Sequence, residues 1–262
     1  MTNTLTLHEV DWSIVGPALL AGWLVLATHV PLGIQVLRRG IVFIDLAIAQ
    51  IAGLGVIAAD ALGWEPQGWG VQLAAMGAAL LGAGLLTWTE KRWPDIQEAL
   101  IGTLFVVASC VGILLLANNP HGGEHLKDLL VGQILWVTPQ QLWAMAGVSA
   151  LVLLLGWARG RWGGQSGHHH ATFYLLFALA VTASVQLVGV YLVFSSLIMP
   201  ALAVRHAPAP WQWPLAWLMG GLAYALGLAL SAMFDWPSGA VVVLVMALLG
   251  LVFSAIIPKS VD

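Results

Sequence analysis

The segment RRGIVFIDLAIAQIAGLG at residues 38–55 places one carboxylate, Asp45, and one amide, Gln50, inside an apolar run. An aspartate at the centre of a membrane helix costs about 2.5 to 3.5 kcal/mol on insertion scales, so such residues tend to be functional. Asp45 has two alternative roles: a binding or pathway role, or a hydrated position near the helix end where it pairs with Arg38 or Arg39. Gln50 either forms a hydrogen bond to a neighbouring helix or lines the same pathway.

The helical positions of Asp45 and Gln50 differ, because 100° per residue separates them by about 140°. Asp45 instead shares its face with Ile48, Ala49 and Ala52. The many small residues of this segment allow another helix to approach closely. Close packing around polar groups suits the wall of a translocation path.

One group of histidines suggests a metal site in the segment HGGEHLKD. His121 and His125 are four residues apart, so on a helix both could face one divalent cation. Glu124 or Asp128 would then add an oxygen ligand. The alternative is a polar loop that binds no metal.

Other histidines also leave two interpretations open. His168, His169 and His170 are consecutive, which is typical either of a flexible metal-chelating tract or of a solvated linker. His29 precedes Pro31 inside an apolar stretch, where it is either a buried, hydrogen-bonded histidine or part of a pathway.

The composition predicts an all-α, polytopic membrane protein. Of the 262 residues, 60% are hydrophobic and 8% are charged, whereas soluble proteins average about 25% charged residues. No predicted loop is long enough for a soluble domain, so we expect residues 1–262 to form a single transmembrane domain. The sequence has no catalytic or nucleotide-binding motif, which predicts a protein that is not an enzyme and has no ATPase of its own. The single cysteine, Cys110, excludes an internal disulfide.

Apolar runs of about 20 residues predict eight or nine transmembrane helices. The region 171–204 is too long for one span and too short for two full ones, and Gly189 lies near its middle. It predicts a full helix followed by a short, broken or re-entrant one, of a kind that often lines transport pathways. The predicted segments are 14–36, 41–60, 70–88, 97–117, 138–157, 171–189, 191–204, 214–233 and 238–257.

The basic residues predict the orientation of these segments. If all nine segments cross, eight of the nine Lys and Arg fall on one side, and only Lys127 falls on the other. The positive-inside rule then puts the N-terminus outside and the C-terminus in the cytoplasm. Most of the 14 tryptophans lie near predicted span ends, where the membrane interface favours them.

Five segments in order resemble the permease subunits of zinc/manganese-type ABC importers. The most specific is LVGVYLVFSSLIMPALAVR (187–205). The others are PLGIQVLRRGIVFIDLAIAQIAGLGV (31–56), QEALIGTLFVVASCVGILLL (97–116), GEHLKDLLVGQILWVT (123–138) and GLALSAMFDWPSGAVVVLVMALL (227–249).

This resemblance implies a vitamin-B12-importer-like permease in the bacterial inner membrane. The chain would pair with a second copy of itself, with a cytoplasmic ATPase subunit and with an extracytoplasmic metal-binding protein, and would have no nucleic-acid partner. It would bind no cofactor, because the partner subunit uses the ATP. The transported substrate would be Zn²⁺ or Mn²⁺, with Asp45 and Gln50 on the translocation path.

The sequence differs from the family pattern at two places. The family has a histidine four residues after the aspartate, whereas this chain has Ala49 there and Gln50 next, with one extra residue that a π-bulge could absorb. An amide oxygen is a harder ligand than an imidazole. The family's cytoplasmic coupling helix is also replaced by a short, glycine-rich stretch at 158–170. Either the ATPase contact is rebuilt elsewhere, for example at 90–98, or coupling differs in this chain. The short stretch is the main support for an alternative function, an ATPase-independent metal or small-solute transporter or channel. A third interpretation is a non-transporting membrane subunit that scaffolds or senses, against which the polar residues of the second span argue.

Overall fold

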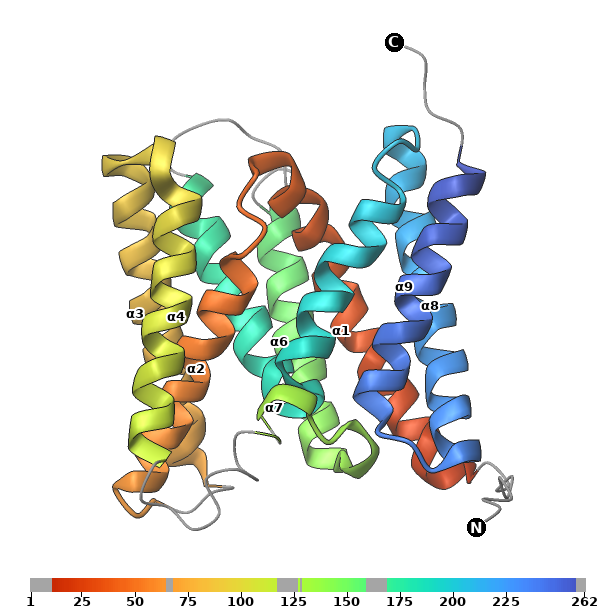
Figure 1. Ribbon diagram of the computed structural model, residues 1–262, viewed down its shortest axis with the longest axis horizontal. Helices are drawn as coiled ribbons and strands as arrows, with labels where there is room; N and C mark the ends of the chain where they lie inside the picture. Colours follow the sequence, from red (N-terminus) through yellow and green to blue (C-terminus); the bar gives the residue numbers. More distant parts are fainter. Residues whose placement is uncertain (1–10, 65–67, 117–126, 128, 159–168, 258–262) are drawn as a thin grey trace, which may run out of the picture.

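The computed structural model describes residues 11–64, 68–116, 127, 129–158 and 169–257. Over these residues the chain forms long helices joined by short turns (Figure 1). The helices are α1 (Trp12–Arg39), α2 (Ile44–Ala61), α3 (Trp69–Arg92), η1 (Pro94–Ile96), α4 (Gln97–Leu116), η2 (Ile134–Trp136), α6 (Pro139–Ala158), α7 (His169–Ala203), α8 (Ala209–Phe234) and α9 (Ser238–Ile256).

Within the described part of the chain, eight helices are long and apolar enough to cross a membrane. Their bounds agree with the predicted spans to within a few residues. The exception is α7, which joins two helices across a non-helical residue, Gly189 (φ 78°, ψ 162°). The break predicted inside 171–204 is therefore confirmed.

The helix α7 folds back on itself at this break. The ring of Phe173 lies 4.3 Å from the Arg39 guanidinium carbon, near the C-terminal end of α1. The second half of α7 returns to the same end of the bundle. There the Leu197 carbonyl packs against Gly33, which lies in the C-terminal part of α1. Figure 1 shows the two halves as the arms of a narrow V.

The turn of α7 is held by a backbone crossing between Gly132 and Gly189. Both residues have positive φ angles, 72° and 78°. A Cβ on Gly132 would overlap the backbone of Val188, and a Cβ on Gly189 would overlap that of Gly132. The Gln133 amide donates a hydrogen bond to the Leu187 carbonyl at 3.3 Å. The segment before η2 is thereby fixed against the midpoint of α7.

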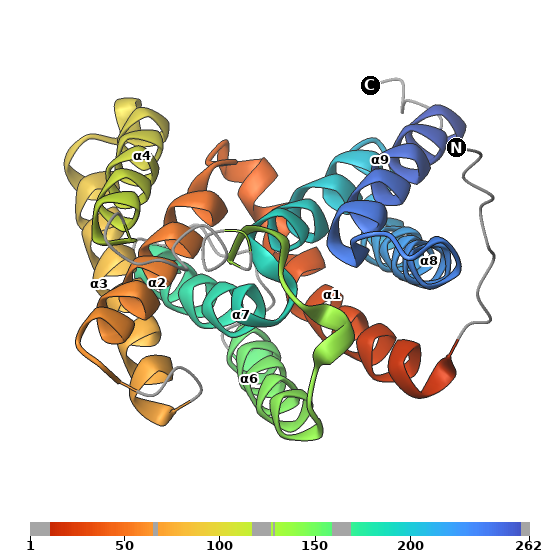
Figure 2. The same cartoon turned by 60° about the horizontal axis from the view of Figure 1, so that its bottom comes forward.

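The centre of the bundle is α7, which packs against α1, α2, α3, α6, α8 and α9. In its most apolar window 78% of the residues are buried, compared with 22% in α4 and in α9. Figure 2 shows α3 and α4 on one side of α7 and α8 and α9 on the other. The outer helices therefore present apolar faces outward, as a lipid-embedded protein requires.

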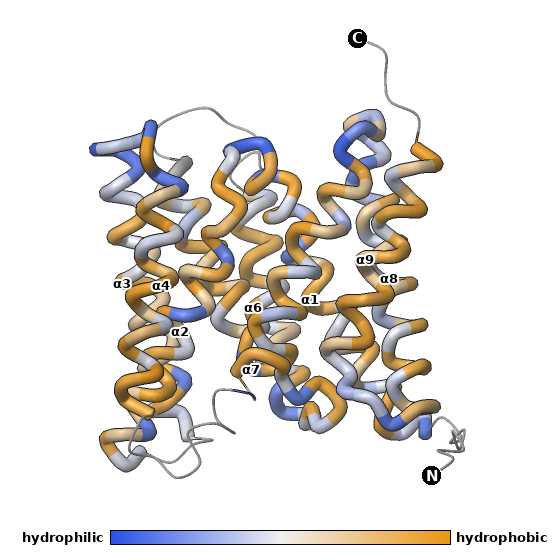
Figure 3. The backbone as a smooth tube through the Cα atoms, in the orientation of Figure 1, coloured by the Kyte–Doolittle hydropathy of each residue, from blue (hydrophilic) through white to orange (hydrophobic). Residues whose placement is uncertain are grey.

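Polar residues gather at the two ends of the bundle (Figure 3). We call the end at which α1 finishes the basic end, because it carries Arg38, Arg39, Lys91, Arg92 and Arg205. Most exposed tryptophans lie near the helix ends, as predicted for an interfacial belt. Those near helix ends are Trp12, Trp64, Trp69, Trp88, Trp93, Trp136, Trp157, Trp211, Trp213 and Trp236, whereas exposed Trp23, Trp143 and Trp217 lie farther inside α1, α6 and α8.

The helix α1 has a defined signal at each terminus. The Asp11 carboxylate accepts hydrogen bonds from the Ser13 hydroxyl at 2.7 Å and from the Ser13 amide at 2.9 Å. These bonds favour the ionised form and lower the pKa of Asp11. At the other terminus Gly40 adopts the left-handed conformation (φ 71°) and donates to the Leu37 carbonyl. The chain then enters α2 within four residues.

Candidate functional site

The Asp45 carboxylate lies in the first turn of α2 and is fully buried. Neither of its oxygen atoms has a hydrogen-bond partner among the described residues. The two arginines considered as partners contact other groups: Arg38 donates to Gln212 at 3.0 Å, and Arg39 lies over the Phe173 ring. Burying a carboxylate without a partner costs free energy. No hydrogen bond with a described residue offsets that cost for Asp45, so its presence is not explained by the stability of the fold.

The loop before α2 fixes the position of Asp45. The Phe43 amide donates a hydrogen bond to Glu98 Oε1 at 3.2 Å, which links this loop to the first turn of α4. On the sequence alone, Glu98 is explained by its place at a helix N-terminus, where acids are favoured. Its contact with the loop is a second role that the helix-start pattern does not reveal.

We expect Glu98→Ala to lower the free energy of unfolding by about 1 kcal/mol, because it removes a partly exposed hydrogen bond to a charged group. Metal uptake should fall as well, since the loop before Asp45 loses its tie to α4. Thermal denaturation and an uptake assay measure the two effects. Asp95→Ala is the matched control, because Asp95 has no hydrogen bond or ion pair to any described residue. Equal melting and uptake in both variants would contradict this role of Glu98.

The face of α2 that carries Asp45 is the predicted one. Ile48, Ala49 and Ala52 are all fully buried. The helix is regular from Ile44 to Ala61, so no π-bulge is present to absorb the extra residue. Gln50 lies on a different face and is only partly buried. No described residue forms a hydrogen bond with Gln50, so the part of the chain that the structure describes offers it no interhelical partner.

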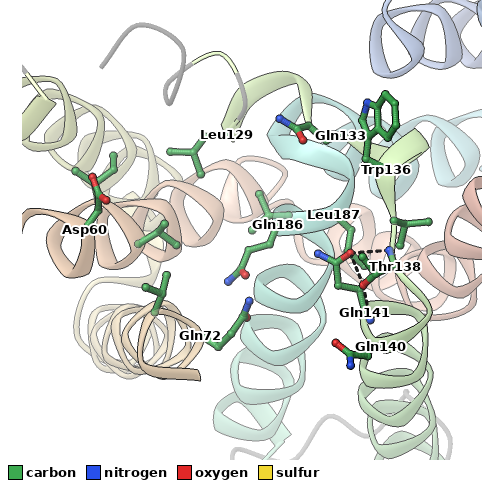
Figure 4. A pocket seen from close by; sticks show the side chains of 15 residues that line it. Asp60, Gln72, Leu129, Gln133, Trp136, Thr138, Gln140, Gln141, Gln186 and Leu187 are labelled. Carbon is green, nitrogen blue, oxygen red and sulfur yellow. Dashed lines mark hydrogen bonds between the residues drawn. The ribbon is translucent and has the colours of Figure 1, made fainter. Parts of the chain in front are cut away.

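A cavity of about 560 Å³ lies at the end of the bundle opposite the basic end. Its walls come from α2, α3, α6, α7 and the segment around η2, and Figure 4 shows its side chains. The amides of Gln72 on α3 and Gln186 on α7 point toward one another across it. The polar lining residues are Asp60, Gln72, Gln133, Thr138, Gln140, Gln141 and Gln186.

The glutamines that line the cavity are not among the site residues predicted from the sequence. Gln72 and Gln186 lie in apolar spans, the same context that drew attention to Gln50. A search for every amide inside a predicted span would have found them. Their convergence is a tertiary property, because they lie on different helices.

The predicted histidine sites fall largely outside the described residues. His121, Glu124, His125 and Asp128 all lie there, and so does His168. His169 and His170 form the start of α7. Among the described residues, no group of three or more His, Cys, Asp or Glu side chains could hold a metal ion.

His29 is a buried, hydrogen-bonded histidine. Its Nδ1 lies 2.9 Å from the Val25 carbonyl and 3.0 Å from the Thr28 hydroxyl. Its Nε2 lies 3.2 Å from the Ser184 hydroxyl, which links α1 to α7. Both ring nitrogens therefore have partners, as expected of a histidine that stabilises helix packing.

Comparison with known proteins identifies the family of the chain. The sequence profile described as the ABC 3 transport family matches residues 11–159 and 166–257. The manganese transport system membrane protein MntC of Halalkalibacterium halodurans is 26% identical over 254 residues, which cover 90% of this chain and 85% of that protein. A Haemophilus influenzae protein named "Probable iron transport system membrane protein" is 25% identical over 203 residues, covering 71% and 72%.

A solved structure has the same fold. PsaBC from Streptococcus pneumoniae, determined in complex with a Fab, superimposes with a TM-score of 0.75 and 25% sequence identity. The match covers 94% of this chain and 92% of that one. Because the family profile spans almost all of the described helices and the fold agrees, the chain belongs to the ABC 3 transport family.

Proposed function

We propose that the chain is the permease subunit of an ATP-driven importer that carries Zn²⁺ or Mn²⁺ into the cytoplasm. The observation that carries this proposal is Asp45, a fully buried carboxylate whose two oxygens have no hydrogen-bond partner among the described residues. Within a membrane such a group is expected on an ion pathway. Family relatives named for manganese and iron transport support a divalent metal as the substrate.

The pathway that we propose follows one face of α2. Asp60 and Val56 line the cavity, and the helical repeat places Ala52, Ala49 and Asp45 on the same face. Fifteen residues at 1.5 Å each separate Asp45 from Asp60 by about 22 Å along the axis. Ala49 and Ala52 are fully buried, so this route is closed between its ends. Opening it requires helix movement, which the ATPase would supply.

We place the basic end of the bundle in the cytoplasm. Four of its basic residues, Arg38, Arg39, Lys91 and Arg92, lie in the last turns of α1 and α3, in agreement with the positive-inside rule. The C-terminus of α9 then faces the cytoplasm, and the cavity faces the outside of a bacterial inner membrane. A metal-binding protein would deliver the ion to the cavity.

The partner subunits follow from the family. A cytoplasmic ATPase would dock on the basic end, and a second copy of the chain would complete the channel. Most of the short stretch 158–170 lies outside the described residues. The turn at η1 offers a further contact surface, since the apolar side chains of Trp93 and Ile96 are exposed there. Membership of an ABC family favours this assembly over an ATPase-independent transporter.

Co-purification tests the assembly directly. The tagged chain should be produced together with candidate ATPase subunits of the source organism and extracted in mild detergent. We expect the ATPase to co-elute and the complex to hydrolyse ATP faster when the metal-loaded binding protein is added. A chain that elutes without any ATPase, and that shows uptake independent of ATP, would support the ATPase-independent alternative instead.

A further inference from the structure

We propose that the cavity between α2, α3, α6 and α7 is an outer binding site that holds a hydrated divalent cation of the Mn²⁺ type before it reaches Asp45. This inference rests on the proposed import function and adds to it a second site and a preferred ion chemistry.

The donor atoms of the cavity are oxygens and amides. The polar lining groups are one carboxylate, five glutamine amides and one threonine hydroxyl, and none of the fifteen lining residues is a histidine or cysteine. Carboxylate, carbonyl and water oxygens suit Mg²⁺, Ca²⁺ and Mn²⁺, whereas imidazole and thiolate suit Zn²⁺ and softer ions. The lining therefore favours a hard cation.

The size of the cavity fits an ion that keeps its water. A water molecule takes up about 30 Å³, so an ion with six waters needs about 200 Å³. The cavity holds about 560 Å³, which leaves room for the ion together with its six waters. Side chains would then bind the coordinated waters, and Asp60 would supply the attractive charge. Such a site gives moderate affinity, which suits an ion that must move on.

Gln72 and Gln186 are the side chains best placed to bind this water shell. They point toward one another from α3 and α7 (Figure 4). The Gln186 Nε2 atom is buried and has no hydrogen-bond partner among the described residues. This amide N–H only donates, so it would bind a water oxygen at the edge of the shell, whereas the glutamine Oε1 atoms would accept hydrogen bonds from waters coordinated to the ion. Gln141 is less available, because its Oε1 accepts hydrogen bonds from the Thr138 amide and hydroxyl.

The backbone around Gln186 is held in place. Gln186 lies three residues before Gly189, where α7 reverses, and the neighbouring Leu187 carbonyl accepts a hydrogen bond from the Gln133 amide. Gln133 also lines the cavity. Gln133 and Gln186 therefore both lie close in sequence to the backbone crossing between Gly132 and Gly189. A movement of that crossing would change the shape of the cavity.

Binding of Mn²⁺ tests the outer site separately from Asp45. The full-length chain, in complex with its ATPase in lipid nanodiscs, is titrated with MnCl₂, and free Mn²⁺ is followed by electron paramagnetic resonance. The background is Asp45→Asn, which removes the inner carboxylate. Onto it are added Gln72→Leu with Gln186→Leu, Gln72→Glu alone, or Gln212→Leu as the matched control at the basic end.

We expect Asp45→Asn to retain one bound Mn²⁺ per chain. The double leucine variant should weaken the dissociation constant by about tenfold or more, and Gln72→Glu should strengthen it by a similar factor through its added charge. Gln212→Leu should change nothing. Loss of all Mn²⁺ binding in Asp45→Asn, or equal binding in all cavity variants, would overturn the outer site.

The proposed function fails by a different result, the absence of ATP-driven metal uptake by the wild-type complex. The binding titration does not depend on turnover, so the two failures are distinguishable. The gain expected for Gln72→Glu also separates the outer site from a general loss of folding, because a misfolded protein would not bind Mn²⁺ more tightly.

Discussion

Asp45→Asn is expected to lower ATP-driven uptake of Mn²⁺ or Zn²⁺ by about tenfold or more, equivalent to at least about 1.4 kcal/mol in the barrier or in binding. Asparagine has nearly the same shape but no charge, so it cannot attract a cation in a low-dielectric environment. The carboxylate oxygens have no partner among the described residues, so the substitution breaks no contact there. The amount of folded complex should therefore stay the same or rise. Uptake of radioactive metal into vesicles, normalised to the purified complex, measures the effect.

The control for this variant is Asp95→Asn. It makes the same chemical change at an exposed position on η1, outside the proposed pathway. We expect it to transport like the wild type. If Asp45→Asn and Asp95→Asn show the same uptake, Asp45 is not part of the pathway.

The second large effect is expected at the crossing of Gly132 and Gly189. Gly189→Ala and Gly132→Ala should each lower the free energy of unfolding by about 4 kcal/mol or more, a loss large enough to prevent assembly. Each residue has a positive φ, which costs an L-residue about 1 to 2 kcal/mol. Each new Cβ would also overlap backbone atoms, which cannot move aside as a flexible side chain can. The yield of monodisperse protein and its thermal denaturation report the loss.

Gly77 and Gly102 provide matched controls, because each lies in a helix and a Cβ there would meet nothing within 4 Å. Alanine at these positions should be neutral or stabilising by up to about 1 kcal/mol, since glycine is the poorer helix former. Melting temperatures of Gly189→Ala and Gly132→Ala that match those of the controls would show that the crossing contributes nothing to stability.

The sequence predicts the helices well because the signal for a membrane span is local. Length, hydropathy and flanking tryptophans define each segment without knowledge of its neighbours. The break at Gly189 is also local, since 34 residues cannot form two full spans and glycine tolerates the required φ angle. The partner of this break, Gly132, is not predictable in the same way. It lies more than fifty residues away, and only the fold brings the two together.

The candidate site is predictable in part for the same reason. Asp45 stands out as a charge within an apolar run, and its helical face is correct. Whether it pairs with Arg38 or Arg39 depends on where α1 ends and α7 begins, which periodicity does not show. The cavity is even less predictable from the sequence, because Gln72, Gln133 and Gln186 come from three separate segments. Their common position follows from packing around α7.

The most direct test of the account is metal accumulation by the reconstituted importer. Proteoliposomes containing the chain and its ATPase, with ATP inside and the metal-loaded binding protein outside, should accumulate Mn²⁺ against its gradient. Accumulation should stop when ATP is omitted, and it should fall by about tenfold or more when Asp45→Asn replaces the wild type. Accumulation that persists without ATP, or that is unchanged by Asp45→Asn, would contradict an ATP-driven pathway through Asp45.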